Sequence, residues 1–202
     1  MKLGHALRIG AAVIVAATGV VGAAGSAGAD IVPGAKIAYM SMRDGQADIH
    51  TMEANGTSQL NITHEKGSAK ADVEPAWSPD GSMLAFERQY KQRRSVLMVI
   101  KADGTKLRTL SPPSPLGGTR DSHPSWSPDG GAVVFTSNRD GNFDLYTVKA
   151  NGLGLRQLTF TKGAVRNLSP QWSPDGRTIL FTRSGNNVVP GSQAHLYLLK
   201  LA

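Results

Sequence analysis

The chain has 202 residues, 40% of them hydrophobic, and it contains no cysteine. The lack of cysteine excludes a disulfide framework and a thiolate metal site. With 23 glycines and 11 prolines, the composition is rich in turns and favours a globular all-β protein over a helical or disordered one. The formal net charge is +7.

The first 29 residues have the three-part pattern of a secretory signal peptide. Lys2 and Arg8 form a basic segment, an apolar run covers 9–21, and small residues occupy 27–29. This pattern predicts cleavage before Asp30 and export to a periplasmic or extracellular location. A membrane anchor is the alternative, but the apolar run is shorter than the roughly 20 residues that span a bilayer. The mature chain, residues 30–202, is therefore not expected to span a membrane.

Removal of the predicted signal peptide takes away two positive charges and lowers the net charge from +7 to +5. This excess is modest and is typical of a solvated basic surface. The mature chain also lacks interleaved stripes of basic and aromatic residues. Together with the predicted export, these features argue against nucleic-acid binding.

A five-residue motif, Trp-Ser-Pro-Asp-Gly, occurs at 77–81, 126–130 and 172–176. A second motif, Ala-Asn-Gly or Ala-Asp-Gly, begins at positions 54, 102 and 150. Both motifs recur every 46 to 49 residues. Two markers with one spacing predict a repeat architecture.

Within each repeat, short apolar segments alternate with turn residues, which predicts strands joined by tight turns. In chain order the predicted strands are 36–41, 48–53 and 58–63; 75–78, 83–86, 95–101 and 106–110; one around Trp126, then 132–137, 144–149 and 155–160; and one around Trp172, then 178–183 and 195–200. The first repeat lacks its Trp-bearing inner strand and the last lacks its outer strand. We therefore expect fourteen strands in four sheets.

Small sheets of this kind cannot bury both faces alone, and radial stacking covers each sheet with its neighbour. The sequence thus predicts a β-propeller of about four blades, each a four-stranded antiparallel sheet. Two arrangements remain open. The four blades close into a ring, or they form an open arc that a second copy completes.

The segment from Pro124 to Thr159, PSWSPDGGAVVFTSNRDGNFDLYTVKANGLGLRQLT, resembles the TolB-like β-propeller repeat. The resemblance extends over roughly residues 36–201, and it implies the propeller fold. Complete rings in this family generally have six or more blades, so the resemblance leaves a homo-oligomer open beside a closed four-bladed ring. It does not imply a reaction, because such propellers serve both as scaffolds and as enzyme domains.

The residues that recur in the main motif are interpreted as structural. A ring of carboxylates for a cation and a stacking platform for sugars are the alternatives. Repetition in each blade favours aspartates that cap their own turns, glycines with positive φ and tryptophans that pack between blades. These residues are Trp77, Asp80, Gly81, Trp126, Asp129, Gly130, Trp172, Asp175 and Gly176.

No catalytic residue, metal or cofactor is predicted. The mature chain has no G-x-S-x-G motif, no paired-carboxylate signature and no phosphate-binding loop. Asp140–Asp144 starts like a calcium loop but lacks its later ligands, so an ordinary hairpin is favoured. His123 with Asp121 is the best zinc candidate, yet no local ligand spacing supports it.

The loops that lead into the inner strands differ from repeat to repeat, which is typical of a surface specialised for binding. Their polar residues are the predicted partner contacts: Asp72, Glu74, Arg120, Asp121, His123, Arg166 and Asn167. A separate basic hairpin loop contains Arg88, Lys91, Arg93 and Arg94. It suits an anionic envelope polymer, phospholipid head groups or an acidic protein, and the simpler alternative is a solvated loop that protects a sheet edge.

The leading hypothesis is a secreted, non-catalytic β-propeller that binds a protein or a cell-envelope component. A propeller-type hydrolase or lyase acting on a polysaccharide or peptide is the first alternative. A self-associating structural arc is the second.

Overall fold

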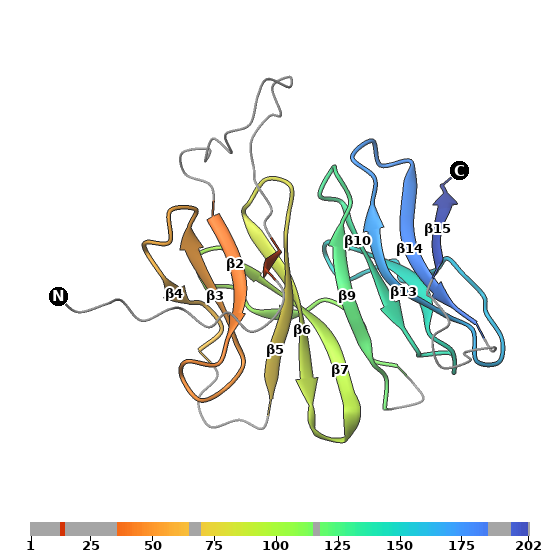
Figure 1. Ribbon diagram of the computed structural model, residues 1–202, viewed down its shortest axis with the longest axis horizontal. Coiled ribbons are helices and arrows are strands. Elements are labelled where there is room, and N and C mark those ends of the chain that lie inside the picture. Colours follow the sequence, from red (N-terminus) through yellow and green to blue (C-terminus); the bar gives the residue numbers. More distant parts are fainter. Residues whose placement is uncertain (1–12, 15–35, 65–69, 115–117, 186–194, 202) are drawn as a thin grey trace.

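The structure is a computed structural model that describes residues 13–14, 36–64, 70–114, 118–185 and 195–201. The predicted signal peptide lies outside these residues except for Val13 and Ile14. The strands form four antiparallel sheets that follow one another along the chain (Figure 1). This arrangement confirms the predicted all-β fold with one sheet for each sequence repeat.

Within each sheet the strands lie in chain order. The first sheet contains β1 (Val13–Ile14), β2 (Lys36–Ser41), β3 (Asp48–Glu53) and β4 (Leu60–Asn61). The second contains β5 (Ala71–Trp77), β6 (Met83–Tyr90), β7 (Arg94–Lys101) and β8 (Arg108–Thr109), with the short 3₁₀ turn η1 (Lys91–Arg93) between β6 and β7. The third contains β9 (Asp121–Trp126), β10 (Ala132–Ser137), β11 (Asp144–Lys149) and β12 (Arg156–Gln157). The fourth contains β13 (Arg166–Trp172), β14 (Thr178–Ser184) and β15 (His195–Lys200).

The strands differ from the sequence prediction at the inner and outer edges of the sheets. The inner strand β5 begins at Ala71, before the predicted start at Pro75, whereas β4, β8 and β12 have only two residues each. In the first sheet, β1 occupies the inner position that the prediction left empty, since Val13 pairs with Tyr39 of β2. The described strands therefore number fifteen rather than fourteen.

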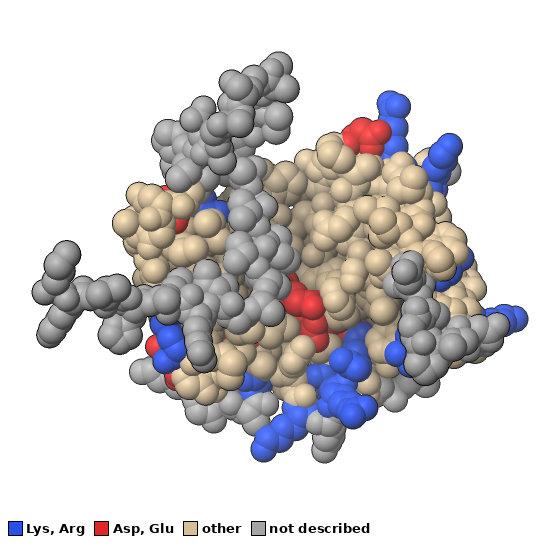
Figure 2. Space-filling view, viewed as in Figure 1, with Lys and Arg blue, Asp and Glu red and all other residues tan. Residues whose placement is uncertain are grey.

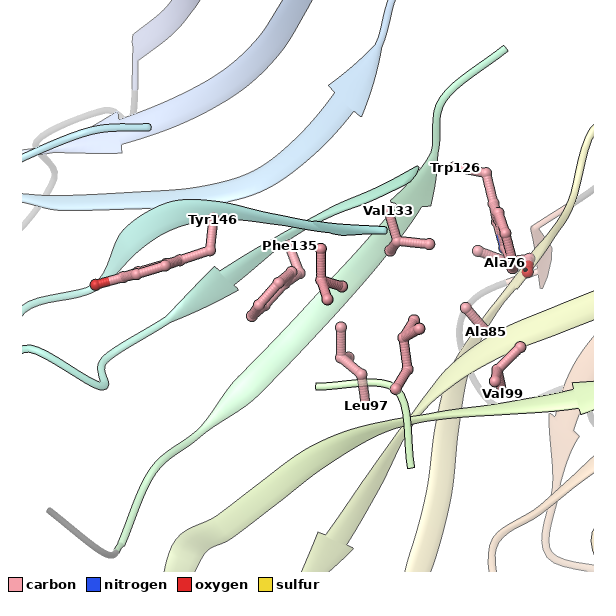
Figure 3. Packing of buried hydrophobic residues seen from close by; sticks show 10 residues of the cluster. Ala76, Ala85, Leu97, Val99, Trp126, Val133, Phe135 and Tyr146 are labelled. Carbon is pink, nitrogen blue, oxygen red and sulfur yellow. Dashed lines mark hydrogen bonds between the residues drawn. The ribbon is translucent and has the colours of Figure 1, made fainter. Parts of the chain in front are cut away.

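Adjacent sheets pack face to face through apolar side chains from their middle strands. Between the second and third sheets, Ala85 and Leu97 meet Val133 and Phe135 in one buried cluster (Figure 3). Trp126 lies at the inner edge of this cluster, and its indole Nε1 donates a hydrogen bond to the Ala76 carbonyl, 3.1 Å away. The motif tryptophan of one blade is thus tied to the inner strand of the blade before it.

The pairing registers of the sheets show which residues are equivalent. Leu97, Leu145 and Leu196 each lie at one position of the third strand, opposite Glu87, Thr136 and Thr182 respectively. Leu97 is fully buried against the third sheet and Leu145 against the fourth, whereas Leu196 is 69% exposed. Leu198 is also 69% exposed, and Leu180 is 39% exposed.

Within the described residues no further sheet follows the fourth one, so the face of β14 and β15 that points away from the third sheet is an uncovered interblade face. Figure 1 shows the first and fourth sheets at opposite sides of the molecule. The four sheets form an open arc rather than a closed ring. Among the described residues, no helix is long and apolar enough to cross a membrane.

Candidate functional site

The antiparallel order brings both sequence-predicted surfaces to the same end of the sheets. The inner strand β5 begins where β6 ends, because Ala71 pairs with Gln89 and Asp72 pairs with Arg88. We call this end, where β5, β9 and β13 begin, the loop face. The opposite end, which carries the Ser-Pro-Asp-Gly turns, is called the turn face.

Three of the predicted partner contacts are buried beneath the loop face. Asp72, Asp121 and Asn167 lie at equivalent positions, five residues before the motif tryptophan, and each is at most 1% exposed. Asp72 accepts two hydrogen bonds of 2.7 Å from Arg88, and Asp121 accepts bonds of 3.1 and 3.0 Å from Arg139. Side chains held in this way do not reach an outside partner.

The third member of this series, Asn167, is uncharged. Asn167 Oδ1 accepts a 2.8 Å hydrogen bond from Arg183 Nε. The three arginines also lie over aromatic rings of the interblade cores, such as Arg139 over Tyr146 at 5.3 Å. Arg88, which the sequence placed in the basic loop, is therefore a buried structural residue. The signal for these pairs was present in the sequence as a polar residue at one fixed distance before each tryptophan.

A strained bulge follows each buried pair. Glu74, His123 and Ser169 lie at equivalent positions, and their φ angles are +55°, +54° and +52°. The strand pairing shifts register at each of these points. Bulges of this kind redirect a side chain out of the regular alternation, and positive φ is costly for residues other than glycine. The backbone of the bulge is repeated, whereas its side chain differs in every blade.

Two of these bulge residues are joined across neighbouring blades. Glu74 Oε2 accepts a hydrogen bond from the backbone N–H of His123 at 2.9 Å, and Glu74 Oε1 lies 3.2 Å from His123 Nε2. The ring nitrogen Nδ1 of His123 is 3.0 Å from the Ser122 hydroxyl. The side chains of His123 and Glu74 remain 40% and 30% exposed, so this pair is accessible from solvent.

A third ionisable residue, which the sequence analysis did not predict, lies close to Glu74. Glu87 lies on β6 at the position that Thr136 and Thr182 occupy in the later blades. It is 3% exposed. Burial, followed by repulsion from Glu74, raises the pKa of Glu87 to about 7, although a hydrogen bond from Gln89 opposes the shift. We call Glu74, Glu87 and His123 the acid–histidine cluster.

The basic hairpin lies beside the start of β9. Ser95, at the base of this hairpin, forms a parallel bridge with Arg120, and its hydroxyl donates to the Asp121 carbonyl at 2.9 Å. Figure 2 shows Lys and Arg side chains gathered along the lower edge of the molecule around the β6–β7 hairpin, with acidic side chains above them near the centre. Arg166 lies further along the loop face, with its guanidinium 5.4 Å from the Phe143 ring centroid.

The turn face is built from the repeated motif. Asp80, Asp129 and Asp175 each accept a 2.6 Å hydrogen bond from the serine two residues earlier and a second bond from the backbone N–H two residues later. These bonds lower the pKa of each carboxyl. Gly81, Gly130 and Gly176 complete the turns with φ near +70°.

Two shallow hollows, of about 400 and 330 Å³, lie between consecutive turns on this face. Trp126 lines the first and Trp172 lines the second, while Trp77 is buried against the first sheet. Because these hollows are lined mainly by residues of the repeat itself, they are a product of blade stacking. The loop face, where the repeats differ, is the better candidate site.

Among the residues that the structure describes, no group of three or more His, Asp or Glu side chains is placed to hold a metal ion. His123 does not face Asp121, whose carboxylate is bound to Arg139. Its acidic neighbour is Glu74 on the adjacent blade.

Comparison with known proteins places this architecture in a family. The family model described as the TolB beta propeller domain matches residues 32–196. A Protein TolB homolog from Chlorobium luteolum is 29% identical over 130 residues, which is 64% of this chain and 28% of that protein. A Tricorn protease homolog 1 from Streptomyces coelicolor is 35% identical over 86 residues, which is 42% of this chain and 8% of that protein. The chain thus spans less than a third of either relative.

Solved structures show the same fold. A putative TolB from Agrobacterium tumefaciens superposes with a TM-score of 0.70 at 22% identity, covering 83% of this chain and 58% of that one. TolB from Acinetobacter baumannii gives a TM-score of 0.63 at 24% identity, covering 82% of this chain and 38% of that one. With the family model matching most of its length, the chain belongs to the TolB β-propeller domain family.

Proposed function

We propose that this chain is an exported, non-catalytic binding domain whose loop face holds a protein or another cell-envelope component. The contact surface consists of the accessible residues Glu74, Arg120, His123 and Arg166. Asp72, Asp121 and Asn167 support this surface from below through their bonds to the three arginines.

One observation carries the proposal. The bulge backbone recurs in three blades with the same positive φ, but its side chain is Glu in one blade, His in the next and Ser in the third. A repeated scaffold with changing polar side chains is what a specialised binding surface requires. The motif on the turn face shows the opposite behaviour, since its residues are the same in the three blades that contain it.

The test is capture of the partner by tagged chain from an envelope fraction, with the wild type compared against a double variant, Glu74→Gln with His123→Asn. Asparagine tolerates positive φ, so the bulge is kept while the pair across the blades is lost. We expect capture to fall at least tenfold with an unchanged unfolding midpoint. The matched control is Lys101→Gln with Lys149→Gln, two exposed residues at the turn face. Equal capture by the double variant and the wild type would remove the loop face as the binding site.

A second candidate role, self-association, is favoured by the exposed interblade face of β14 and β15. Leu180, Leu196 and Leu198 form an exposed apolar surface. The equivalents of Leu180 and Leu196 in the third sheet, Val134 and Leu145, are fully buried. Exposed apolar patches of this kind mark interaction surfaces. Sedimentation over a wide concentration range tests this role. A mass that rises with concentration, and returns to that of a monomer in the variant Leu196→Lys with Leu198→Lys, would support it, whereas a monomer at all concentrations would exclude it.

A further inference from the structure

The β6–β7 hairpin has longer strands than the corresponding hairpins of the first and third sheets. The strands β6 and β7 have eight residues each, whereas β2, β3, β10 and β11 have six. The connection is correspondingly shorter, because only η1 (Lys91–Arg93) joins these strands whereas six residues join the others, so the β6–β7 hairpin stays paired almost to its tip. In Figure 1 the tip of this hairpin, 90–94, extends further down than the other described connections of the loop face, and it forms a convex feature at the edge of the molecule.

The same hairpin also differs in charge from the corresponding connections of the first and third sheets. The corresponding connections of the first and third sheets carry an Arg-Asp-Gly sequence, at 43–45 and 139–141, in which the acid balances the base. The projecting tip has no acid and contains Lys91, Arg93 and Arg94, all of them exposed. Within the described part of the chain, none of these three forms an ion pair with a carboxylate. Their charge is available to an outside ligand.

An aromatic ring orders the base of the tip. The Tyr90 ring has Arg94 at 5.4 Å and Lys70 at 5.7 Å from its centroid. Contacts between cations and an aromatic face hold the long side chains in place. On the other side, Arg120 is tied to the hairpin through its bridge with Ser95. The tip thus presents ordered cations together with a half-buried amphipathic ring.

We propose that this hairpin binds the surface of a membrane that contains anionic phospholipids. A convex tip with several cations and no enclosing walls fits a flat array of phosphate head groups better than a single extended acidic peptide, which is usually held in a groove. Tyr90 suits the boundary between head groups and acyl chains because one end of its ring is apolar and the other polar. The binding residues, Tyr90, Lys91, Arg93 and Arg94, are separate from the proposed partner contacts, so this inference does not depend on the proposed function.

The test is flotation of the protein with vesicles of phosphatidylcholine that contain 30 mol% (about a third) phosphatidylglycerol, a composition chosen to give a strongly anionic surface. The hairpin variant is Lys91→Gln, Arg93→Gln and Arg94→Gln. The control variant removes the same charge elsewhere through Lys101→Gln, Lys149→Gln and Arg156→Gln, all exposed residues. The wild type and the variants are expressed in the same cells, so that all of them have the same N-terminus and differ only at the substituted residues.

We expect the wild type to bind the anionic vesicles, and the hairpin variant to lose on the order of a hundredfold in partitioning, since each basic residue near such a surface contributes about a factor of five. The control should fall by less than about threefold, and high salt should release the wild type. Equal loss in both variants, equal binding to pure phosphatidylcholine, or equally tight binding to soluble polyglutamate would each overturn the proposal. An unchanged unfolding midpoint shows that the hairpin variant is folded.

Discussion

Arg139 and Asp121 form a buried ion pair that joins the turn between β10 and β11 of the third blade to the first residue of its inner strand, β9. Arg139 Nη2 lies 3.1 and 3.0 Å from the two Asp121 oxygens, and the two side chains are 6% and 2% exposed. The guanidinium also lies over the rings of Phe135 and Tyr146. This pair therefore connects the loop face to the interblade core.

Removal of one member of this pair should be costly, because the other charge would remain buried without a partner. We expect Asp121→Ala to lower the free energy of unfolding by about 3–5 kcal/mol, measured by urea denaturation. Asp121→Asn should cost clearly less, since Asn167 already fills the equivalent position opposite Arg183 in the fourth blade. Equal losses in the two variants would show that the charge itself, rather than the hydrogen bond, is required.

Glu87 should make the stability of the fold depend on pH. Its pKa is raised from 4.5 to about 7, first by burial and then by Glu74. Between these two values the folded protein holds more protons than the unfolded chain, so stability falls as the pH rises. We expect Glu87→Gln to raise the free energy of unfolding at pH 8, by at most about 3 kcal/mol, and to flatten this part of the profile. The measurement is urea unfolding of both proteins from pH 4 to 8 (roughly the window of this titration). A parallel pH profile in the two proteins would contradict the assignment.

The turn aspartates should have the opposite effect on the pH dependence of folding stability. Asp129 accepts hydrogen bonds from the Ser127 hydroxyl and the Gly131 N–H, and these bonds lower its pKa. Its contribution is present above the ordinary value of 3.8 and is lost as the pH falls through the lowered value. Asp129→Ala should destabilise the protein by about 1 kcal/mol at neutral pH, as measured by urea denaturation. A loss of partner capture without a loss of stability would instead point to a binding role for the turn face.

Two equivalent leucines should differ in their importance for folding. Leu145 is fully buried between the third and fourth blades, whereas Leu196 occupies the same register on the open face. Leu145→Ala should cost about 2–5 kcal/mol, and Leu196→Ala less than about 0.5 kcal/mol, in denaturation of dilute protein. A large effect at Leu196 in dilute solution would mean that another part of the chain covers this face.

The repeat motif was enough to predict the sheets, because its tryptophan, its turn and the alternating apolar residues depend only on local patterns. The fourth blade shows what such patterns omit. Leu180, Leu196 and Leu198 have the sequence of a buried face and are nevertheless exposed, since burial depends on a following blade. The two-residue β1 pairing was also beyond a local pattern.

The loop residues show the same limit at the candidate site. Sequence variety drew attention to the inner-strand loops, but it gave Asp72 and Glu74 the same role. Their environments differ because the bulge turns Glu74 away from the regular alternation, whereas Asp72 stays in register with Arg88. Glu87 was not predicted as a site residue, because its equivalence to Thr136 and Thr182 becomes clear only when the strand registers of the sheets are compared.

The central claim, that the loop face is the binding surface, is tested most directly by photocrosslinking in cells. A photoreactive amino acid is placed at His123 on the loop face, and in a second version at Leu153, which is 67% exposed near the turn face. We predict a discrete crosslinked product at position 123 and none at position 153. A product at position 153 alone, or the same product at both positions, would contradict the claim.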